Sequence, residues 1–231
     1  RGRAALNVKK STDKLQRHPY EPCYLYESGI LPLQQFPIKG IIWYQGESNA
    51  HNREAHEKLF KLLVDSWRKN WEDNELPFYY VQLSSIDRPS WPWFRDSQRR
   101  FLTQISHTGM AVTSDKGDSL NVHPTHKQEV GERLAVWALN KTYNYKNVVP
   151  SGPLFKSVSF KNGAAYISFD YSEGLHASDN NEIRTFELSG DDQIFYPAKA
   201  AVVNGELKVW SDKVKEPTIV RYGWQPFTRA N

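Results

Sequence analysis

The chain has 231 residues, of which 39% are hydrophobic and 24% charged. This composition is typical of a folded protein with one or two domains and excludes a disordered chain. No apolar run approaches the roughly 20 residues that a membrane-spanning helix needs, so we expect no membrane partner. The aromatic share of 13% is high. Aromatic side chains fill a core, but they also stack on sugar rings, which favours carbohydrate contact.

The formal net charge is +4, from 30 basic and 26 acidic side chains. The basic residues are dispersed and belong to no recognisable nucleic-acid-binding module, so we expect no nucleic-acid partner. The sequence opens at Arg1 without a signal-peptide pattern, and its only methionine is Met110. We therefore expect the chain to begin within a longer protein. The single Cys23 allows no disulfide within the chain and leaves the compartment open.

Strand and helix patterns alternate through the first part of the chain. After a short amphipathic helix around residues 24–33, the predicted strands are 39–44, 77–83 and 109–113, and the predicted helices are 54–71, 95–105 and 126–143. The first strand reads as one that is buried on both faces, because its apolar run is continuous. Such alternation predicts an α/β fold with a parallel sheet, whose chemistry lies in loops beyond the carboxyl ends of the strands.

The pattern changes at a Pro/Gly-rich linker, residues 148–153. Beyond it we predict six strands, at residues 158–160, 165–169, 185–188, 198–203, 207–210 and 218–222. Asn162-Gly163 and Asn204-Gly205 are turn dipeptides typical of hairpins. The sequence therefore predicts two domains, an α/β catalytic domain at 1–150 and a smaller all-β accessory domain at 151–231.

A first polar cluster, Gln45-Gly46-Glu47-Ser48-Asn49-Ala50-His51, directly follows the first predicted strand. A carboxylate, two amides, a hydroxyl and an imidazole at a strand end form a candidate site. The structural alternative is an Asn/Gly turn that leads into a helix cap.

A second polar cluster, residues 115–126, follows the third predicted strand. Pro124 restricts the backbone of His123 and holds its imidazole in a stiff loop before a helix, which suits a general base. His123 and His126 lack a nearby cysteine or a closely spaced third ligand, so we expect no metal.

Four segments then carry a family resemblance: KGIIWYQGESNA (39–50), LPFYYVQL (76–83), GMAV (109–112) and VHPTHKQEVGERLA (122–135). They resemble the sialate O-acetylesterases, which belong to the SGNH (GDSL-like) hydrolase superfamily, and SGP (151–153) and VRYGW (220–224) extend the similarity. The resemblance implies a flavodoxin-like, doubly wound domain that lacks its N-terminal part. It also implies a carboxylic ester hydrolase that removes acetyl groups from sialic acid or another glycan, without a cofactor.

The resemblance also implies site residues. His123 would be the base, and Gln45 or Asn49 would donate hydrogen bonds to the oxyanion. Position 121 is Asn rather than the acid found in some relatives, so Glu47 is the candidate that orients the imidazole, with Asp118 and Asp115 as alternatives.

The family's nucleophilic serine lies in a Gly-Gln-Ser-Asn segment, and no such segment occurs in this chain. Ser48 superficially imitates it, but its position after WYQ matches the later amide block. We therefore expect the serine before Arg1, in a missing N-terminal portion of the same protein. A non-catalytic carbohydrate-binding fragment and an acetylxylan-type esterase remain alternatives.

Two further sets of residues are candidates for sugar contact. Arg95 and Gln98, three positions apart, could grip an acidic sugar, and a structural salt bridge is the alternative for Arg95. Trp91 and Trp93 flank Pro92 and could stack on a glycan or pack in the core. From the resemblance we expect a periplasmic, extracellular or lysosomal location.

Overall fold

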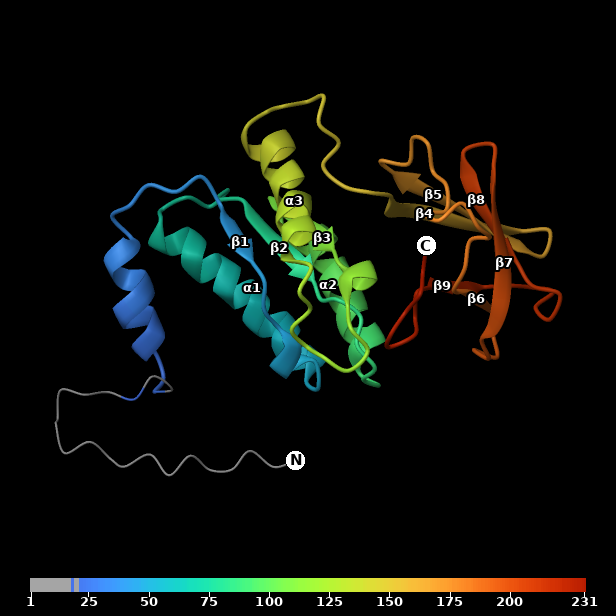
Figure 1. The fold of residues 1–231 in the computed structure, drawn as a ribbon, viewed down its shortest axis with the longest axis horizontal. Coiled ribbons are helices and arrows are strands. Elements are labelled where there is room, and N and C mark those ends of the chain that lie inside the picture. Colours follow the sequence, from blue (N-terminus) through green and yellow to red (C-terminus); the bar gives the residue numbers. More distant parts are fainter. Residues whose placement is uncertain (1–17, 19–20) are drawn as a thin grey trace.

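The structure is a computed structural model that describes residue 18 and residues 21–231; the start of the predicted 1–150 domain lies outside these residues. Two β-sheets lie side by side (Figure 1). The helix expected around 24–33 is a π-helix, Tyr26–Ile30, followed by a 3₁₀ helix, Leu31–Leu33. No helix in the described part of the chain is long and apolar enough to cross a bilayer.

The first sheet has three parallel strands, β1 (Ile41–Trp43), β2 (Phe78–Gln82) and β3 (Thr108–Val112), with β2 in the centre. The helices between and after them are α1 (Arg53–Asn70), α2 (Trp91–Gln104) and α3 (Lys127–Trp137). A π-helical turn, Ala138–Thr142, continues α3. The predicted alternation of strand and helix is confirmed.

The helices cover both faces of this sheet. Phe60 of α1 and Phe101 of α2 pack against Phe78 on one face, whereas Trp137 of α3 packs against Tyr79 on the other. This separation follows from β2, whose successive side chains point to opposite faces. The α3 helix approaches so closely at Gly109 that a Cβ there would lie 2.5 Å from the Trp137 ring. The fold is therefore α/β and doubly wound, as expected.

Two sequence expectations need correction in this part. Helix α2 begins at Trp91 rather than at residue 95, because Pro92 fits the first turn, where its missing N–H group costs nothing. Within the described residues, strand β1 is not buried on both faces: it lies at the edge of the described sheet, and the Ile42 side chain is 69% exposed. Its apolar run had suggested a central strand.

The second sheet is antiparallel, in the order β4-β5-β8-β7-β6-β9. Its strands are β4 (Leu154–Lys161), β5 (Ala164–Asp170), β6 (Phe186–Ser189), β7 (Tyr196–Val203), β8 (Glu206–Trp210) and β9 (Ile219–Tyr222). All six predicted strands occur. Both Asn-Gly pairs have positive φ at each residue, 49° and 70° at Asn162-Gly163 and 52° and 80° at Asn204-Gly205, as tight hairpin turns require.

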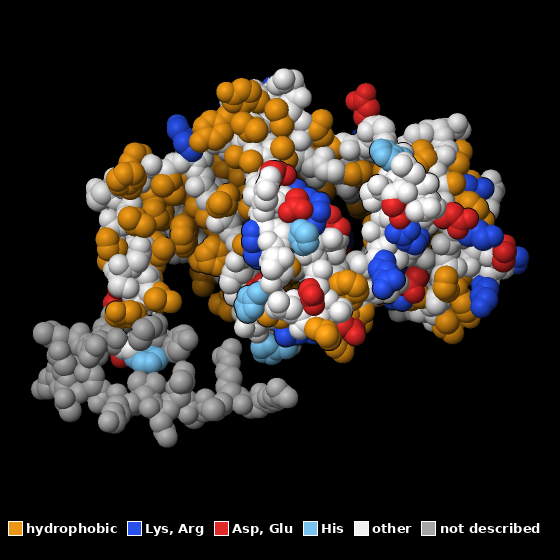
Figure 2. All heavy atoms as spheres, viewed as in Figure 1, with side chains coloured by type: hydrophobic (Ala, Val, Ile, Leu, Met, Phe, Trp, Pro, Cys, Tyr) orange, Lys and Arg blue, Asp and Glu red, His pale blue; other side chains and the backbone are white. Residues whose placement is uncertain are grey.

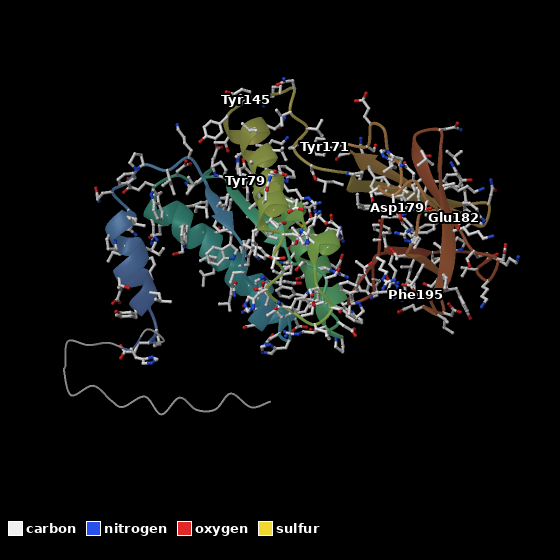
Figure 3. The ribbon with its side chains drawn as sticks, in the orientation of Figure 1. Tyr79, Tyr145, Tyr171, Asp179, Glu182 and Phe195 are labelled. Carbon is white, nitrogen blue, oxygen red and sulfur yellow. The ribbon has the colours of Figure 1, made fainter. Side chains whose placement is uncertain are left out.

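The two sheets are joined by side-chain contacts as well as by the chain. Tyr171 follows β5 and lies on the side of the second sheet that faces the first (Figure 3). Its ring meets the Trp137 ring edge-on, with 6.5 Å between the ring centres, and its hydroxyl accepts a hydrogen bond from Lys141. The segment after β9 runs back to α2, where the ring centres of Trp224 and Trp93 lie 5.5 Å apart. The second sheet is thus attached at both α3 and α2.

Candidate active site

Three loops follow the three parallel strands, and parallel strands end at the same edge of a sheet. They span residues 44–52, 83–90 and 113–126. A buried cluster at this edge contains Leu83 and Trp91, and both Tyr44 and Val122 pack against it. The Lys127 ammonium also lies 4.3 Å from the centre of the Tyr44 ring. The two polar clusters predicted from the sequence are therefore neighbours.

The loop after β1 is bent by Gly46, whose φ of +144° is rarely adopted by other residues. A Cβ at Gly46 would also lie 3.1 Å from the Phe94 ring. This bend leads into a 3₁₀ turn, Glu47–Asn49, and then into α1, which Asn52 caps by accepting a hydrogen bond from Ala55 N–H at 3.2 Å. The loop thus contains the helix cap that was considered as the structural alternative.

The amides of Gln45 and Asn49 are paired within this loop. Gln45 Nε2 donates to Asn49 Oδ1 at 2.8 Å. Because that bond uses the oxygen of Asn49, the Nδ2 group of Asn49 remains available as a donor. Gln45 therefore fixes the direction in which Asn49 presents its N–H groups.

The loop after β3 is held by side chains that accept backbone hydrogen bonds. Asp118 Oδ1 accepts from Leu120 N–H and Asn121 N–H, both at 2.8 Å. Asn121 Oδ1 in turn accepts from His123 N–H at 2.9 Å. These bonds mimic turns and stiffen the backbone that leads to His123, whose side chain is exposed.

The same loop is packed tightly against the loop after β2. A Cβ at Gly117 would lie 2.1 Å from the Ser85 carbonyl oxygen, so only glycine fits there. Asp87 N–H also donates to the Ser119 carbonyl at 3.0 Å. The three loops consequently form one connected surface.

Two of the three candidate carboxylates have structural partners. Asp115 forms a two-pronged pair with Arg133 at 2.6 and 2.7 Å, and Arg133 opposes the desolvation that would otherwise raise the Asp115 pKa, so this pKa is lowered. Backbone N–H groups of Leu120 and Asn121 lower the pKa of Asp118. Glu47 accepts one hydrogen bond, at Oε2, from the adjacent Gly46 N–H at 3.1 Å. In the described part of the chain, Arg133 thus occupies both oxygens of Asp115, whereas Glu47 and Asp118 each keep one oxygen without a protein partner.

The hydrogen bond expected between Glu47 and His123 is not formed in this structure, within the residues that it describes. The Glu47 carboxylate turns back to its own loop instead. It helps to line an open pocket of about 410 Å³. The other residues that line this pocket are Ser48, Ala50, His51, Arg88, Ser90 and Trp91. The pocket joins the loop after β1 to the loop after β2.

Arg95 and Gln98 lie where α2 packs, which differs from the expectation that they grip an acidic sugar. Arg95 is 5% exposed and donates to Ser85 Oγ and to the carbonyls of Gly223, Gln225 and Pro226. Burial lowers its pKa to about 10, so it is still charged at pH 7. It is bound by backbone carbonyls rather than by the carboxylate of a salt bridge.

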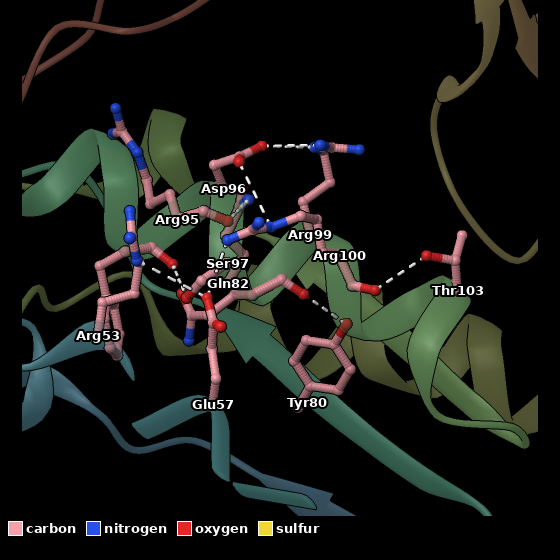
Figure 4. A network of polar contacts seen from close by, with 12 residues as sticks. Arg53, Glu57, Tyr80, Gln82, Arg95, Asp96, Ser97, Arg99, Arg100 and Thr103 are labelled. Carbon is pink, nitrogen blue, oxygen red and sulfur yellow. Dashed lines mark hydrogen bonds and ion pairs between the residues drawn. The ribbon is translucent and has the colours of Figure 1, made fainter. Parts of the chain in front are cut away.

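Gln98 is 3% exposed and extends the hydrogen bonding of β2. Its Oε1 accepts from Leu83 N–H at 3.0 Å, and its Nε2 donates to the Val81 carbonyl. The neighbouring Gln82 side chain donates to the Arg95 carbonyl (Figure 4). Both predicted sugar-binding residues of α2 therefore serve the fold.

The two tryptophans that flank Pro92 have different environments. Trp91 is 2% exposed and donates from Nε1 to the Ser84 carbonyl at 2.7 Å, so it belongs to the core. Trp93 is 49% exposed and lies edge-on to Trp224. The core alternative holds for Trp91 only.

Ser48 is exposed and lines the pocket, and no hydrogen bond joins it to a histidine within residues 21–231. His126 Nδ1 lies 3.4 Å from Glu129 Oε1, and the same oxygen lies 3.2 Å from Lys116 Nζ. No group of three or more His, Cys, Asp or Glu side chains in the described segments is arranged to hold a metal ion.

Sequence reasoning did not single out Arg88 or Ser85. Arg88 lines the pocket from the loop after β2, and a lone arginine in a short polar turn carries no motif that would mark it. Ser85 connects Gly117 and Arg95, a role that depends on contacts between distant parts of the chain.

Comparisons with known proteins agree with this architecture. The family model described as carbohydrate esterase, sialic acid-specific acetylesterase, matches residues 16–140. Sialate O-acetylesterase of Mus musculus is 32% identical over 195 residues, which cover 74% of this chain and 36% of the mouse protein. The human sialate O-acetylesterase is 27% identical over 193 residues, or 74% of this chain and 37% of that protein.

A crystal structure of a carbohydrate acetylesterase from Xanthomonas citri has a TM-score of 0.78 and 38% identity, and the match covers 85% of this chain and 47% of that one. The fold and the loops thus define an α/β protein of the carbohydrate-esterase type. The chain belongs to the family of sialic acid-specific acetylesterases. It spans between about a third and a half of the length of these relatives.

Proposed function

We propose that this chain provides the histidine and the oxyanion donors of a carbohydrate O-acetylesterase that acts on O-acetylated sialic acid. The observation that carries this proposal is the meeting of two loops at one sheet edge. Tyr44 of the QGESN loop and Val122 of the His123 loop pack on the same buried cluster. This packing supports the proposal that two segments far apart in the sequence contribute to one site.

In the proposed mechanism a serine attacks the acetyl carbonyl, and His123 takes its proton. The carbonyl oxygen becomes negatively charged in the resulting tetrahedral intermediate. Asn49 Nδ2, which Gln45 leaves free, would donate a hydrogen bond to it; such a donor contributes roughly 10²–10³ in turnover. The intermediate collapses by breaking the bond to the sugar oxygen, which takes the proton held by His123 and leaves as a hydroxyl. His123 then takes a proton from water, which attacks the acyl-serine, and returns the proton to the serine oxygen as acetate leaves.

We further propose that the nucleophilic serine lies in an N-terminal portion of the same protein that is not part of this chain. An apolar surface beside β1 supports this view, because monomeric proteins seldom leave such a surface uncovered. It includes Leu25, Leu31, Leu33, Phe36, Ile42, Leu59 and Leu62, with exposed fractions between 47% and 71% (Figure 2). The outer edge of β1 is also unpaired within the described sheet, so a further strand could extend it.

The test uses two proteins, residues 1–231 alone and the same chain joined to the preceding polypeptide of its gene. The longer protein should hydrolyse 4-nitrophenyl acetate and O-acetylated sialic acid, and residues 1–231 alone should do neither. His123→Ala in the longer protein should lower turnover roughly 10²–10⁴-fold with unchanged folding. Near-normal turnover of this variant would refute the role of His123.

A serine-directed fluorophosphonate distinguishes the remaining candidates. Labelling of the preceding polypeptide in the longer protein supports the proposal, whereas labelling of Ser48 in residues 1–231 would make the QGESN loop the nucleophile loop. A gene that encodes no Gly-Gln-Ser-Asn segment, together with sugar binding but no hydrolysis, would favour a carbohydrate-binding protein.

A further inference from the structure

We infer that Arg88 recognises the carboxylate of an acidic sugar and thereby determines the substrate class of this site. The inference rests on the proposed function and adds a residue for specificity to it. Arg88 lines the same open pocket as Glu47, Ser48 and His51. It lies on the loop after β2, between the two loops that carry the proposed catalytic groups.

Arg88 has no acidic partner within residues 21–231, which distinguishes it from most other arginines described here. Those that bind carboxylates are Arg53, Arg99, Arg100, Arg133, Arg184 and Arg221. Arg68 and Arg95 instead donate to backbone carbonyls. The guanidinium of Arg88 is therefore an uncompensated positive charge at the wall of a pocket. Its planar fork matches a carboxylate with two parallel hydrogen bonds.

The position of Arg88 is also preorganised. Its guanidinium carbon lies 5.5 Å from the centre of the Trp91 ring, and this ring is itself fixed in the core by its bond to Ser84. The Arg88 backbone is held at both ends, since its N–H group donates to Ile86 and its carbonyl accepts from Trp91. Pro89 restricts the backbone further. A held guanidinium loses less conformational entropy on binding than a free side chain does.

The charges around the pocket agree with an anionic group at Arg88 and a neutral ester elsewhere. Glu47 also lines the pocket, and its negative charge would repel a second carboxylate placed beside it. A substrate with one carboxylate is therefore oriented, with its acid toward Arg88 and away from Glu47. The O-acetyl group of the same sugar can then face the QGESN loop. A neutral sugar, such as acetylated xylose, lacks this orienting contact.

The experiment compares two substrates in the longer protein that carries the serine. The acidic substrate is 9-O-acetyl-N-acetylneuraminic acid, and 4-nitrophenyl acetate is the neutral one. Arg88→Gln should lower kcat/KM for the acidic substrate about 10- to 100-fold, mainly through KM, because a hydrogen bond to a charged group is lost. Turnover of 4-nitrophenyl acetate should change less than about twofold. The matched control is Arg99→Gln, which removes the same charge from an arginine paired with Asp96 and should affect neither substrate.

The methyl ester of the acidic substrate completes a double-mutant cycle. In the wild-type protein, blocking the carboxylate should lower kcat/KM as much as Arg88→Gln does with the free acid. In the Arg88→Gln variant, the ester should lower kcat/KM little further. An equal loss on all substrates, or additive losses in the cycle, would overturn the assignment.

A binding measurement on residues 1–231 separates this inference from the proposed function. N-acetylneuraminic acid should shift the Trp91 indole N–H signal in NMR spectra of the wild-type chain but not of Arg88→Gln. If the longer protein hydrolyses no ester while this shift occurs, the esterase proposal fails and Arg88 stands. If hydrolysis occurs but Arg88→Gln changes kcat/KM equally for the acidic and the neutral substrate, only the role of Arg88 fails.

Discussion

Arg95 and Gln225 are joined by a hydrogen bond of 2.6 Å from the buried guanidinium to the backbone carbonyl, across 130 positions of sequence. The same guanidinium donates to Gly223 and to Ser85. Ser85 lies against Gly117 in the loop that leads to His123. The segment after β9 is thus connected, through one arginine, to the surface that carries the candidate site.

Replacing Arg95 with Met should lower the free energy of unfolding by about 2–4 kcal/mol. The variant keeps a long side chain but leaves the partly buried carbonyls of Gly223, Gln225 and Pro226 without this donor. Urea denaturation followed by tryptophan fluorescence measures the loss. Arg99→Met is the control, because Arg99 is exposed and its surface pair should contribute less than about 1 kcal/mol. Equal effects of the two substitutions would argue against a specific role of Arg95 in joining the sheets.

His56 should make the fold sensitive to mild acid. It is 4% exposed and lies 4.6 Å from the Phe94 ring, and burial lowers its pKa from 6.5 to about 4. Between these values the unfolded chain binds a proton that the folded chain does not, so stability falls as pH falls from about 6.5 to about 4. The loss attributable to this group reaches about 3 kcal/mol at the lower end.

This contribution is measured by urea denaturation at several pH values across that window. His56→Phe should flatten the dependence of stability on pH, whatever its effect at pH 7. His51→Gln, which changes an exposed histidine, serves as the control and should leave the dependence as in wild type. A wild-type slope in His56→Phe would mean that other groups cause the acid sensitivity.

Gly117→Ala should destabilise the protein by at least about 2 kcal/mol, because the new methyl group would overlap backbone atoms of Ser85. The matched control is Gly131→Ala in α3. No heavy atom lies within 4 Å of a Cβ at that exposed position, so alanine should stabilise the helix by about 0.5–1 kcal/mol. Thermal unfolding should show a lower Tm for Gly117→Ala and a higher Tm for Gly131→Ala than for the wild-type protein. Stabilisation by Gly117→Ala would show that the two loops are not in contact.

Periodicity and turn residues were sufficient to predict most of the fold. The apolar stripe of α1 and the Asn-Gly turns are local signals, and both have the predicted structure. Residues that depend on distant partners could not be predicted in this way. Arg95 reads as an exposed helical arginine until the segment after β9 covers it. The edge position of β1 is equally invisible, since an apolar run does not reveal how many neighbours a strand has.

The candidate site shows the same limit. The sequence motifs indicated both loops, and packing of Tyr44 and Val122 on one cluster brings them together. Side-chain hydrogen bonding within each loop was not predictable from the motifs. Asp118 and Asp115 were the alternatives to Glu47, yet Arg133 of α3 occupies both oxygens of Asp115, and two backbone N–H groups of its own loop occupy Oδ1 of Asp118.

Of the two carboxylates that keep a free oxygen in the described part of the chain, Glu47 and Asp118, Glu47 is the one that lines the open pocket, which leads to a prediction about which carboxylate assists His123. One oxygen of Glu47 accepts from Gly46, and the other has no partner in the described part of the chain. The loops of Glu47 and His123 follow β1 and β3, which flank β2 and are therefore roughly 10 Å apart, a gap that the two side chains can span together. We expect the free carboxylate oxygen to approach the imidazole in the complete enzyme with substrate bound.

Glu47→Gln in the longer protein should then lower kcat roughly 10²–10⁴-fold, because the amide keeps the size of the side chain but cannot stabilise the imidazolium and favours the wrong tautomer. Asp118→Asn should change kcat by less than about threefold, since its amide oxygen still accepts from the Leu120 and Asn121 N–H groups. Steady-state rates with 4-nitrophenyl acetate, with folding checked by circular dichroism, compare the two variants directly. If Asp118→Asn is the more damaging substitution, the carboxylate that assists His123 comes from its own loop, and Glu47 serves only to shape the turn after β1.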